Sequence, residues 1–185
     1  MSTIKEIFEL FDKRGNSQYG GEAITQLEHA LQSASLAECD QAPAELIVAA
    51  LLHDLGHLLH ELADDAPEEG IDDQHENSAT NYLRELFPEQ VTEPIRLHVA
   101  AKRFLCAVDV DYLQTLSQPS VVSLGVQGGP MTPAEVADFQ KHPYAMDAVQ
   151  LRRWDDSAKV PNSPTPTLLH FAIYLMQAAS PNEPE

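Results

Sequence analysis

The stretch Ala49-Ala50-Leu51-Leu52-His53-Asp54-Leu55-Gly56-His57 places an ionisable pair, His53-Asp54, among apolar side chains. Over residues 43–62 the apolar positions recur at spacings of three and four, which predicts one core-facing helix across this range. Ionisable side chains in such a helix are costly unless each is hydrogen-bonded or bound to a metal ion. Taken alone, the pair indicates either a metal site or a hydrogen-bonded core histidine.

Helical periodicity dominates the rest of the chain, and strand-like alternation is nearly absent. Further helices are predicted from Ile24 to Ala34, from Asp72 or Asp73 through Leu86, from Pro94 past Phe104, from the capping box Thr132-Pro133-Ala134-Glu135 onward, and over residues 143–156 and 165–178. Residues 107–131 should hold short helices or a functional segment, because idle loops of this length are uncommon in compact domains. We therefore expect an all-α, single-domain helical bundle over residues 1–179, with a frayed tail at 180–185.

Composition limits the partners of the protein. A formal net charge of -18 on 185 residues argues against nucleic-acid and anionic-membrane partners, which such a surface would repel. No apolar run approaches the roughly 20 residues that cross a bilayer, and the N-terminus does not resemble a signal peptide. Two cysteines do not make a disulfide framework, so a cytoplasmic location is expected. Composition gives no indication of the oligomeric state.

Histidines recur on several of the predicted helices. His29, His75 and His98 each lie beside an apolar stripe, and Asp155 falls near the end of a later helix. Inward-facing histidines and carboxylates from separate helices build metal sites in bundle cores, with donors that suit iron, zinc, copper or nickel. Six ligands exceed the number that one ion with an open position needs. The sequence therefore predicts two metal ions held by His29, His53, Asp54, His75, His98 and Asp155.

The order His … His-Asp … His … His … Asp resembles the HD-domain pattern in its two-metal form. Most such domains hydrolyse phosphoesters, so phosphohydrolase is what the bare motif implies. Four other segments resemble the HD-domain phosphonate oxygenases, the 2-amino-1-hydroxyethylphosphonate dioxygenase family. They are residues 18–29, His98-Val99-Ala100-Ala101-Lys102-Arg103, Gln127-Gly128-Gly129-Pro130-Met131 and Arg152-Arg153-Trp154-Asp155.

This resemblance implies a mixed-valence diiron centre, Fe(II)/Fe(III), bridged by Asp54, with O2 as co-substrate. The implied reaction is oxidative cleavage of the C–P bond of a small anionic α-hydroxyphosphonate, giving phosphate and a carboxylic acid such as glycine. Hydroxymethyl-, aminohydroxyethyl- and trimethylammonio-hydroxyethyl-phosphonate are all candidate substrates.

Two cationic residues are spaced so that they can face the metal centre. Lys102 lies four residues after His98, and Arg152 three before Asp155, so each shares a helical face with a ligand. In so acidic a protein they indicate a pocket for a small polyanion, unless each simply balances a local carboxylate.

The resemblance further implies that His57, Ser120 and Gln127 contact the substrate, with Ser123 as an alternative to Ser120. It also implies a lid at residues 15–23 in which Tyr19 occupies an iron position until substrate displaces it. Glu22 is a candidate partner for a substrate ammonium group. In the alternative interpretation Tyr19 is an ordinary surface aromatic and Glu22 a carboxylate in a first helical turn.

Three other functions remain compatible with the ligand set. An HD-type metal-dependent phosphohydrolase would use the same residues without oxygen. An inositol-oxygenase-like enzyme would share the diiron ligands, but its neutral polyol gives no reason for the cationic pair. A non-catalytic HD signalling module would need neither the complete set of ligands nor Lys102 and Arg152.

Overall fold

The computed structural model describes residues 3–59 and 73–180, and every regular element in these ranges is a helix. The elements are α1 (Ile4–Arg14), α2 (Gln26–Cys39), α3 (Ala44–Leu52), α4 (Leu55–Leu59), α5 (His75–Leu83), α6 (Glu89–Val108), α7 (Tyr112–Thr115), α8 (Gln118–Val126), α9 (Pro133–Phe139), α10 (Ala145–Ser157), the 3-10 helix η1 (Leu168–Phe171) and α11 (Ala172–Ala178). The expected all-α fold is confirmed. None of the described helices is both long enough and apolar enough to cross a membrane.

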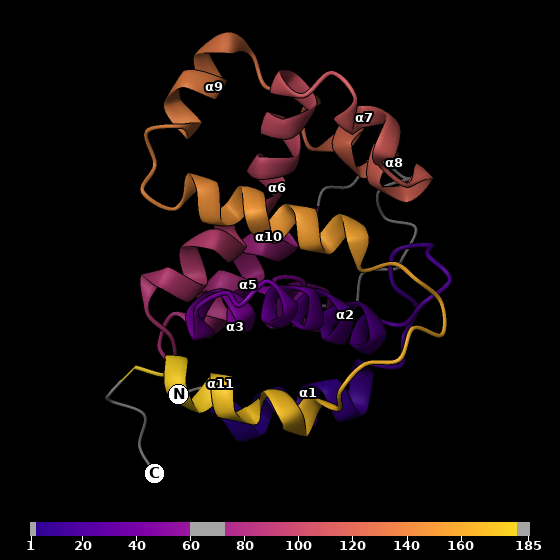
Figure 1. The fold of residues 1–185 in the computed structure, drawn as a ribbon, viewed down its shortest axis with the longest axis vertical. Coiled ribbons are helices and arrows are strands. Elements are labelled where there is room, and N and C mark those ends of the chain that lie inside the picture. The colour runs from indigo at the N-terminus through magenta and orange to yellow at the C-terminus, as the bar shows by residue number, and fades with distance from the viewer. Residues whose placement is uncertain (1–2, 60–72, 181–185) are drawn as a thin grey trace.

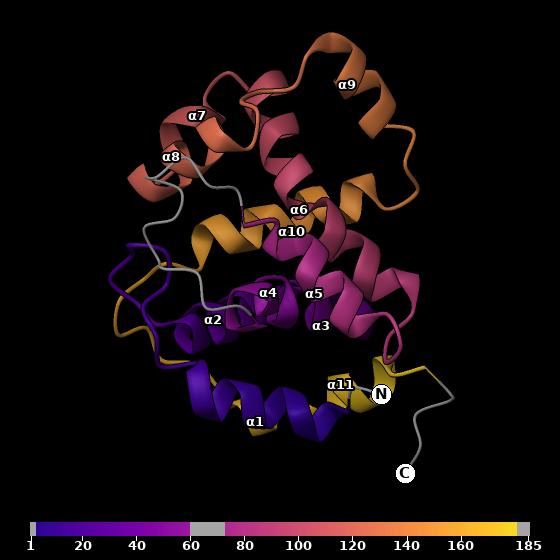
Figure 2. The same ribbon diagram turned by 180° about the vertical axis from the view of Figure 1, so that it is seen from behind.

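The helices stack in layers along the long axis of the molecule (Figures 1 and 2). Helices α1 and α11 lie at one end, α2 and α3 in the middle, α10 and the first part of α6 above them, and α7 to α9 at the other end. The larger apolar core surrounds α3, whose residues 46–52 are all buried. A smaller core joins the second half of α6 to α7, α9 and α10. The elements around α3 carry the candidate site.

The pair His53-Asp54 does not lie within a helix, and the prediction of a single helix over 43–62 was wrong. Helix α3 ends at Leu52 and α4 begins at Leu55, so the pair forms the turn between them; residues 60–62 lie outside the described ranges. Neighbouring residues of a continuous helix point about 100° apart and cannot face one another. The break lets both side chains point toward one centre.

Gly56 fixes how closely α4 approaches α5. A Cβ atom at this position would lie 2.0 Å from the backbone oxygen of His75, far inside any permitted contact. Only glycine therefore allows the helix that follows the His53-Asp54 turn to pack against the backbone that carries His75.

Other helix boundaries also differ from the prediction. Helix α5 begins at His75 after Gln74, so Asp73 is not its N-cap; instead, Asp73 accepts hydrogen bonds from both the backbone and the ring of His75, while Asp72 is not described. Helix α6 begins at Glu89, because Pro88 rather than Pro94 marks its start, and Pro94 lies inside it. Residues 165–178 become helical only from Leu168.

Several expectations for the remaining elements are confirmed. The capping box at Thr132 starts α9 with Pro133 at its first position, and residues 107–131 hold the short helices α7 and α8. Helix α1 was missed, although Thr3 and Glu6 form a capping box of the same kind. The domain boundaries at 1–179 and the tail at 180–185 stay predictions.

Candidate metal centre and substrate pocket

The six predicted metal ligands come from five places in the fold and converge on its interior. His29 lies on α2, the pair His53-Asp54 in the turn between α3 and α4, and the others on α5, α6 and α10. All six side chains are buried, at most 9% exposed. Buried ionisable groups that gather in this way need compensating charge.

The ligands form two clusters joined by Asp54. His29, His53 and Asp155 make one, and Asp54, His75 and His98 the other, with the ligand atoms of each within 4.8 Å of one another. Oδ2 of Asp54 lies 3.4 Å from Nε2 of His29 and 3.2 Å from Nε2 of His53. Its Oδ1 lies 3.3 Å from Nε2 of His75 and 3.4 Å from Nε2 of His98. Asp54 is therefore placed to bridge two ions.

The hydrogen bonds of the four histidines fix which ring nitrogen faces the centre. Each Nδ1–H donates to an oxygen: His29 to the carbonyl of Ala158, His53 to that of Ala50, His98 to that of Ile95 and His75 to the carboxylate of Asp73. The Nε2 lone pairs are thus left for a metal.

Within each cluster, two of these lone pairs face each other. The Nε2 atoms of His29 and His53 are 3.2 Å apart, and those of His75 and His98 are 3.1 Å apart. Two lone pairs at such distances repel unless a cation shares them. The donor set therefore fits a dinuclear metal site, with nitrogen and carboxylate oxygen as ligands.

At one histidine a proton competes with the metal: burial lowers the pKa of His53, but the charges of Asp54 and Asp155 outweigh burial and raise it to about 9. The other shifts favour metal binding. Burial alone would raise the pKa of Asp155, but the charges of Arg152 and Lys159 outweigh it and hold that pKa well below its usual range. The pKa of Asp54 is also lowered against burial, chiefly by the charge of His53. Burial and the charge of His57 lower the pKa of His75 to about 4, so this imidazole is neutral at pH 7, as a metal ligand must be.

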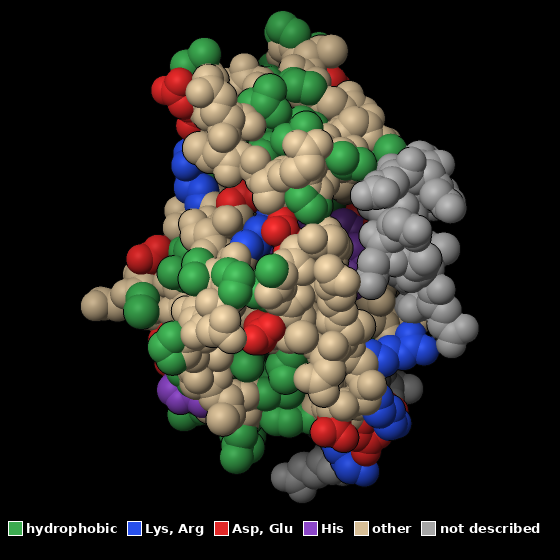
Figure 3. All heavy atoms as spheres, turned by 90° about the vertical axis from the view of Figure 1, so that its right-hand side faces the viewer, with side chains coloured by type: hydrophobic (Ala, Val, Ile, Leu, Met, Phe, Trp, Pro, Cys, Tyr) green, Lys and Arg blue, Asp and Glu red, His purple; other side chains and the backbone are tan. Residues whose placement is uncertain are grey.

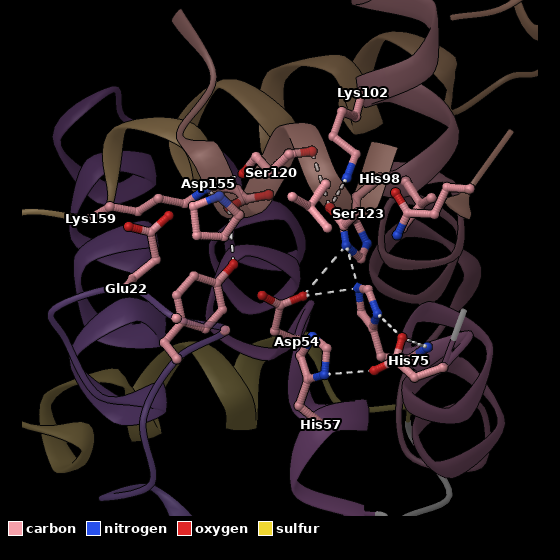
Figure 4. A pocket seen from close by; sticks show the side chains of 18 of the residues that line it. Glu22, Asp54, His57, His75, His98, Lys102, Ser120, Ser123, Asp155 and Lys159 are labelled. Atoms are coloured by element: carbon pink, nitrogen blue, oxygen red, sulfur yellow. Dashed lines mark hydrogen bonds and ion pairs between the residues drawn. The ribbon is translucent and has the colours of Figure 1, made fainter. Parts of the chain in front are cut away.

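A cavity of about 370 Å³ opens beside the metal ligands. Basic, acidic and histidine side chains are visible near the middle of the face shown in Figure 3. Figure 4 shows Asp54 in the pocket with His75 and His98 at one side. The pocket is lined by all the residues that the sequence assigned to the substrate or lid: Tyr19, Glu22, His57, Lys102, Ser120, Gln127 and Arg152.

Lys102 has no carboxylate partner in the part of the chain that the structure describes. Its side chain is 3% exposed, and Nζ donates to Oγ of Ser123 at 2.8 Å. Among the described residues, no carboxylate oxygen lies within 4.0 Å of this nitrogen. Burial, followed by the charge of Arg152, lowers the pKa of Lys102 to about 7. A buried cation in this state is poised to bind an anion.

Arg152, in contrast, is fully engaged by carboxylates. Nη1 lies 2.6 Å from Oδ2 of Asp155, and Nε donates to Oδ2 of Asp156 at 3.1 Å. Nε also donates to Oη of Tyr112 at 3.2 Å. The guanidinium therefore orients Asp155, a predicted metal ligand, and also lines the pocket.

The predicted lid lies over the first cluster. The ring of Tyr19 stacks on that of His29 with centroids 3.8 Å apart, and Oη donates to Oδ1 of Asp155 at 3.4 Å. Gly20 and Gly21 both have positive φ, 43° and 78°, in a turn that brings Glu22 back over the pocket. Oε1 of Glu22 is buried and meets no hydrogen-bond partner within residues 3–59 and 73–180.

His57 and Gln127 also reach the pocket. Nδ1 of His57 lies 2.8 Å from Oδ2 of Asp73, and its ring stacks on that of His75 with centroids 4.0 Å apart. Oε1 of Gln127 is buried and has no hydrogen-bond donor among the described residues. An unsatisfied amide oxygen in the wall of a pocket indicates a polar ligand.

Sequence reasoning missed two residues that the structure brings to the site. Asp73 binds the ring nitrogens of both His57 and His75. Lys159 lines the pocket between Ser120 and Asp155. Lys159 lies beyond the end of α10 at Ser157, so the helical spacing that singled out Lys102 gave no signal for it.

Comparison with known proteins finds close relatives, although no family model matches the chain. Hydroxymethylphosphonate dioxygenase of Gimesia maris is 47% identical over 169 residues, 91% of this chain and 84% of that protein. The [1-hydroxy-2-(trimethylamino)ethyl]phosphonate dioxygenase (glycine-betaine-forming) of Leisingera caerulea is 42% identical, over 91% of this chain and 86% of that protein. The chain belongs to the phosphonate dioxygenases. This membership confirms the family that the sequence resembled.

Uncharacterized protein L432 of Acanthamoeba polyphaga mimivirus is a more distant relative of this phosphonate dioxygenase chain. It is 35% identical over 163 residues, 86% of this chain and 74% of that protein. Membership in the phosphonate dioxygenases favours an oxygenase over the hydrolase and the signalling module that the bare motif left open. The two ligand clusters fit the metal site that such an oxygenase needs.

Proposed function

We propose that the protein is an iron- and O2-dependent dioxygenase that cleaves the C–P bond of a small α-hydroxyphosphonate. One O2 would be consumed for each phosphate and each carboxylic acid released. Two irons in the Fe(II)/Fe(III) state, held by the six ligands, would supply O2 activation and the redox steps. The observation that carries the proposal is the position of Asp54, which joins two histidine clusters beside a pocket with an unpaired ammonium.

The chain's own residues bind and orient the substrate. Lys102 supplies a point charge for the phosphonate, and Ser120 a hydroxyl beside it. The position of His57 is fixed by Asp73, so its ring can contact a substrate lying over His75. Gln127 contributes an amide whose oxygen is free to accept a hydrogen bond from the substrate. These contacts would hold the reacting C1 atom close to the metal ligands.

Tyr19 acts as the cover of the centre. Its ring shields His29, and its hydroxyl hydrogen-bonds to the ligand Asp155. Burial and the charge of Asp155 raise the pKa of Tyr19 well above its usual value, so the hydroxyl keeps its proton. Substrate binding would displace this hydrogen bond, and the positive-φ glycines Gly20 and Gly21 allow the movement. The cover would protect the centre from oxygen until substrate arrives.

The unpaired oxygen of Glu22 supports a substrate with a cationic end. A primary ammonium would satisfy it with a charge-assisted hydrogen bond, which hydroxymethylphosphonate cannot offer. A trimethylammonio group would supply the charge but no N–H donor. We therefore propose that the enzyme prefers aminohydroxyethylphosphonate, followed by trimethylammonio-hydroxyethylphosphonate and then hydroxymethylphosphonate.

The test is an assay of phosphate release by protein purified anaerobically and loaded with iron. We expect the loaded protein to hold about two irons per chain, given the ligand count. With each of the three α-hydroxyphosphonates, it should release phosphate only when O2 is admitted. A zinc-loaded sample and an aryl phosphate ester serve as controls for hydrolysis. A firmly bound single zinc, with hydrolysis of the ester in the absence of O2, would refute the oxygenase and establish the phosphohydrolase.

A further inference from the structure

Lys159 is held in the wall of the pocket by the residues on either side of it. Nδ1 of His29 donates to the carbonyl of Ala158 at 2.9 Å. The backbone of Val160 exchanges two hydrogen bonds with the side chain of Gln32, both of 3.0 Å. The segment after α10 is thus tied to α2 on both sides of Lys159, whose side chain is only 11% exposed. Lys159 is therefore fixed in place as part of the site.

Among the described residues, the ammonium of Lys159 has one hydrogen bond, two looser ion pairs and the ring of Tyr19 at 5.9 Å from its centroid. Nζ donates to Oγ of Ser120 at 3.0 Å. Oδ1 of Asp155 and Oδ1 of Asp156 lie 3.6 and 3.7 Å away, beyond ordinary hydrogen-bond length. An ammonium has three donors, so donor capacity remains for a ligand. Asp155 is also a predicted metal ligand, and a carboxylate that binds a metal has less charge left for a lysine.

Lys159 and Lys102 meet the same face of α8 from different directions, as Figure 4 shows. Lys102 donates to Ser123 and Lys159 to Ser120. These serines are three residues apart and share one side of the helix. Oγ of Ser120 already accepts from Lys159 and from Ser117, so its own hydrogen is available to an anion. Two ammonium groups and a free hydroxyl therefore converge on one part of the pocket.

The charge balance of the pocket favours this assignment. Arg152 and Lys159 both pair with Asp155 and Asp156, but the Arg152 pairs are the closer ones: its Nη1 lies 2.6 Å from Asp155, against 3.6 Å for Nζ of Lys159. Lys102 provides one unpaired charge. The second cation within reach of the same serines is Lys159.

We propose that Lys159 is a substrate-binding residue that, with Lys102 and Ser120, binds the anionic oxygens of the substrate. This inference rests on the proposed function, which supplies the phosphonate. It assigns Ser123 a supporting role, because its hydroxyl donates to the carbonyl of Ser120 at 3.1 Å and accepts from Lys102. Ser120 is then the serine that contacts the substrate.

The test compares Lys159→Met with Lys159→Arg, which keeps the charge. The matched control is Lys141→Met, because Lys141 is exposed, pairs with Asp138 and does not line the pocket. Methylphosphonate lacks the α-hydroxyl, so its binding to metal-loaded protein can be measured by calorimetry without turnover. For Lys159→Met we expect binding about tenfold weaker and KM raised about tenfold, with metal content unchanged. Lys159→Arg should stay within about threefold of wild type.

Two results would overturn the assignment. Methylphosphonate binding and KM equal to wild type in Lys159→Met would remove Lys159 from the substrate site. Lost metal with an unchanged KM in the loaded fraction would show that Lys159 only neutralises Asp155 and Asp156. Lys159→Gln serves in place of the Met variant if that variant does not fold. Binding that depends on Lys159 in a protein that releases no phosphate with O2 would support this inference and refute the proposed function.

Discussion

The guanidinium of Arg152 holds the carboxylate of Asp155, with Nη1 2.6 Å from Oδ2 one helical turn away on α10. Both side chains are buried, and Arg152 binds Asp156 as well. Removal of the guanidinium would take the closest cation from both carboxylates and leave them only the looser pairs with Lys159, and breaking a buried pair costs about 3–5 kcal/mol. The pairing therefore predicts a role for Arg152 in the metal centre as well as in substrate binding.

Arg152→Ala should accordingly lower metal content and stability together. We expect loss of at least one metal ion per chain and destabilisation of about 3–5 kcal/mol in urea unfolding. Arg153→Ala is the matched control. Arg153 is half exposed, and its ion pair with Asp109 is loose, at 3.8 Å. A variant that keeps both metals and changes only KM would make Arg152 a substrate residue alone.

Lys102→Ala should act on the substrate without loss of metal. The ammonium has no carboxylate partner among the described residues, so its removal leaves no buried anion behind. We expect KM to rise, or kcat/KM to fall, by at least about tenfold, as a charge-assisted bond of roughly 1.5–3 kcal/mol implies. Metal analysis should give the wild-type content. Wild-type kinetics in this variant would place the phosphonate elsewhere.

The pH dependence of KM follows from the lowered pKa of Lys102. Burial lowers this pKa to about 7, so the fraction of charged amine falls as pH rises above 7. Since an anion binds the charged form, KM should rise about tenfold per pH unit on the alkaline side. Lys102→Arg stays protonated throughout and should remove this rise. Equal slopes in the two proteins would assign the alkaline limb to another group, such as the phosphonate itself.

Asp54→Ala should lose both metals. Each oxygen of Asp54 faces the Nε2 atoms of one histidine pair, and facing lone pairs without a cation repel. We expect less than half the wild-type metal in both clusters and a lower unfolding temperature, measured by metal analysis and calorimetry. Two retained ions with full activity would exclude Asp54 as a bridge.

The predicted ligands stand out in the sequence because they repeat one conflict: ionisable side chains on apolar helical faces. His29, His75 and His98 each show it, and burial confirms it. The break between α3 and α4 could not be found in the same way, because the apolar stripe continues through His53-Asp54 and gives no sign of the turn. Lys159 was missed for a related reason: its position depends on hydrogen bonds from His29 and Gln32, which are remote in sequence.

Gly56→Ala should test the close approach of α4 to α5. A Cβ atom there meets the backbone oxygen of His75 at 2.0 Å, so the backbone must shift. We expect destabilisation of roughly 1–3 kcal/mol from overpacking, with metal lost from the cluster that contains His75. Gly125→Ala is the control, because nothing lies within 4 Å of its added Cβ atom. Equal effects of the two substitutions would show that the contact does not position His75.

Glu22→Gln should separate the lid from the choice of substrate. Oε1 of Glu22 is buried and unpaired in the pocket, three residues from Tyr19, across the glycine pair. The change removes a negative charge and nearly preserves shape, so only a cationic substrate loses a charge-assisted contact. We expect kcat/KM for 2-amino-1-hydroxyethylphosphonate to fall about tenfold, while hydroxymethylphosphonate is nearly unaffected.

Tyr19→Phe completes this comparison, because it removes the hydrogen bond to Asp155 but keeps the ring stacked on His29. If Tyr19 protects the centre, this variant should admit oxygen to the resting enzyme. It should therefore lose activity in air faster than wild type, and the loss should be equal when activity is measured with either substrate. Equal penalties for the two substrates in Glu22→Gln would mean that Glu22 only supports the lid. A wild-type preference for hydroxymethylphosphonate would remove the ammonium contact, yet it would leave the C–P cleavage assignment standing, because that assignment depends on Asp54 and Lys102 and not on Glu22.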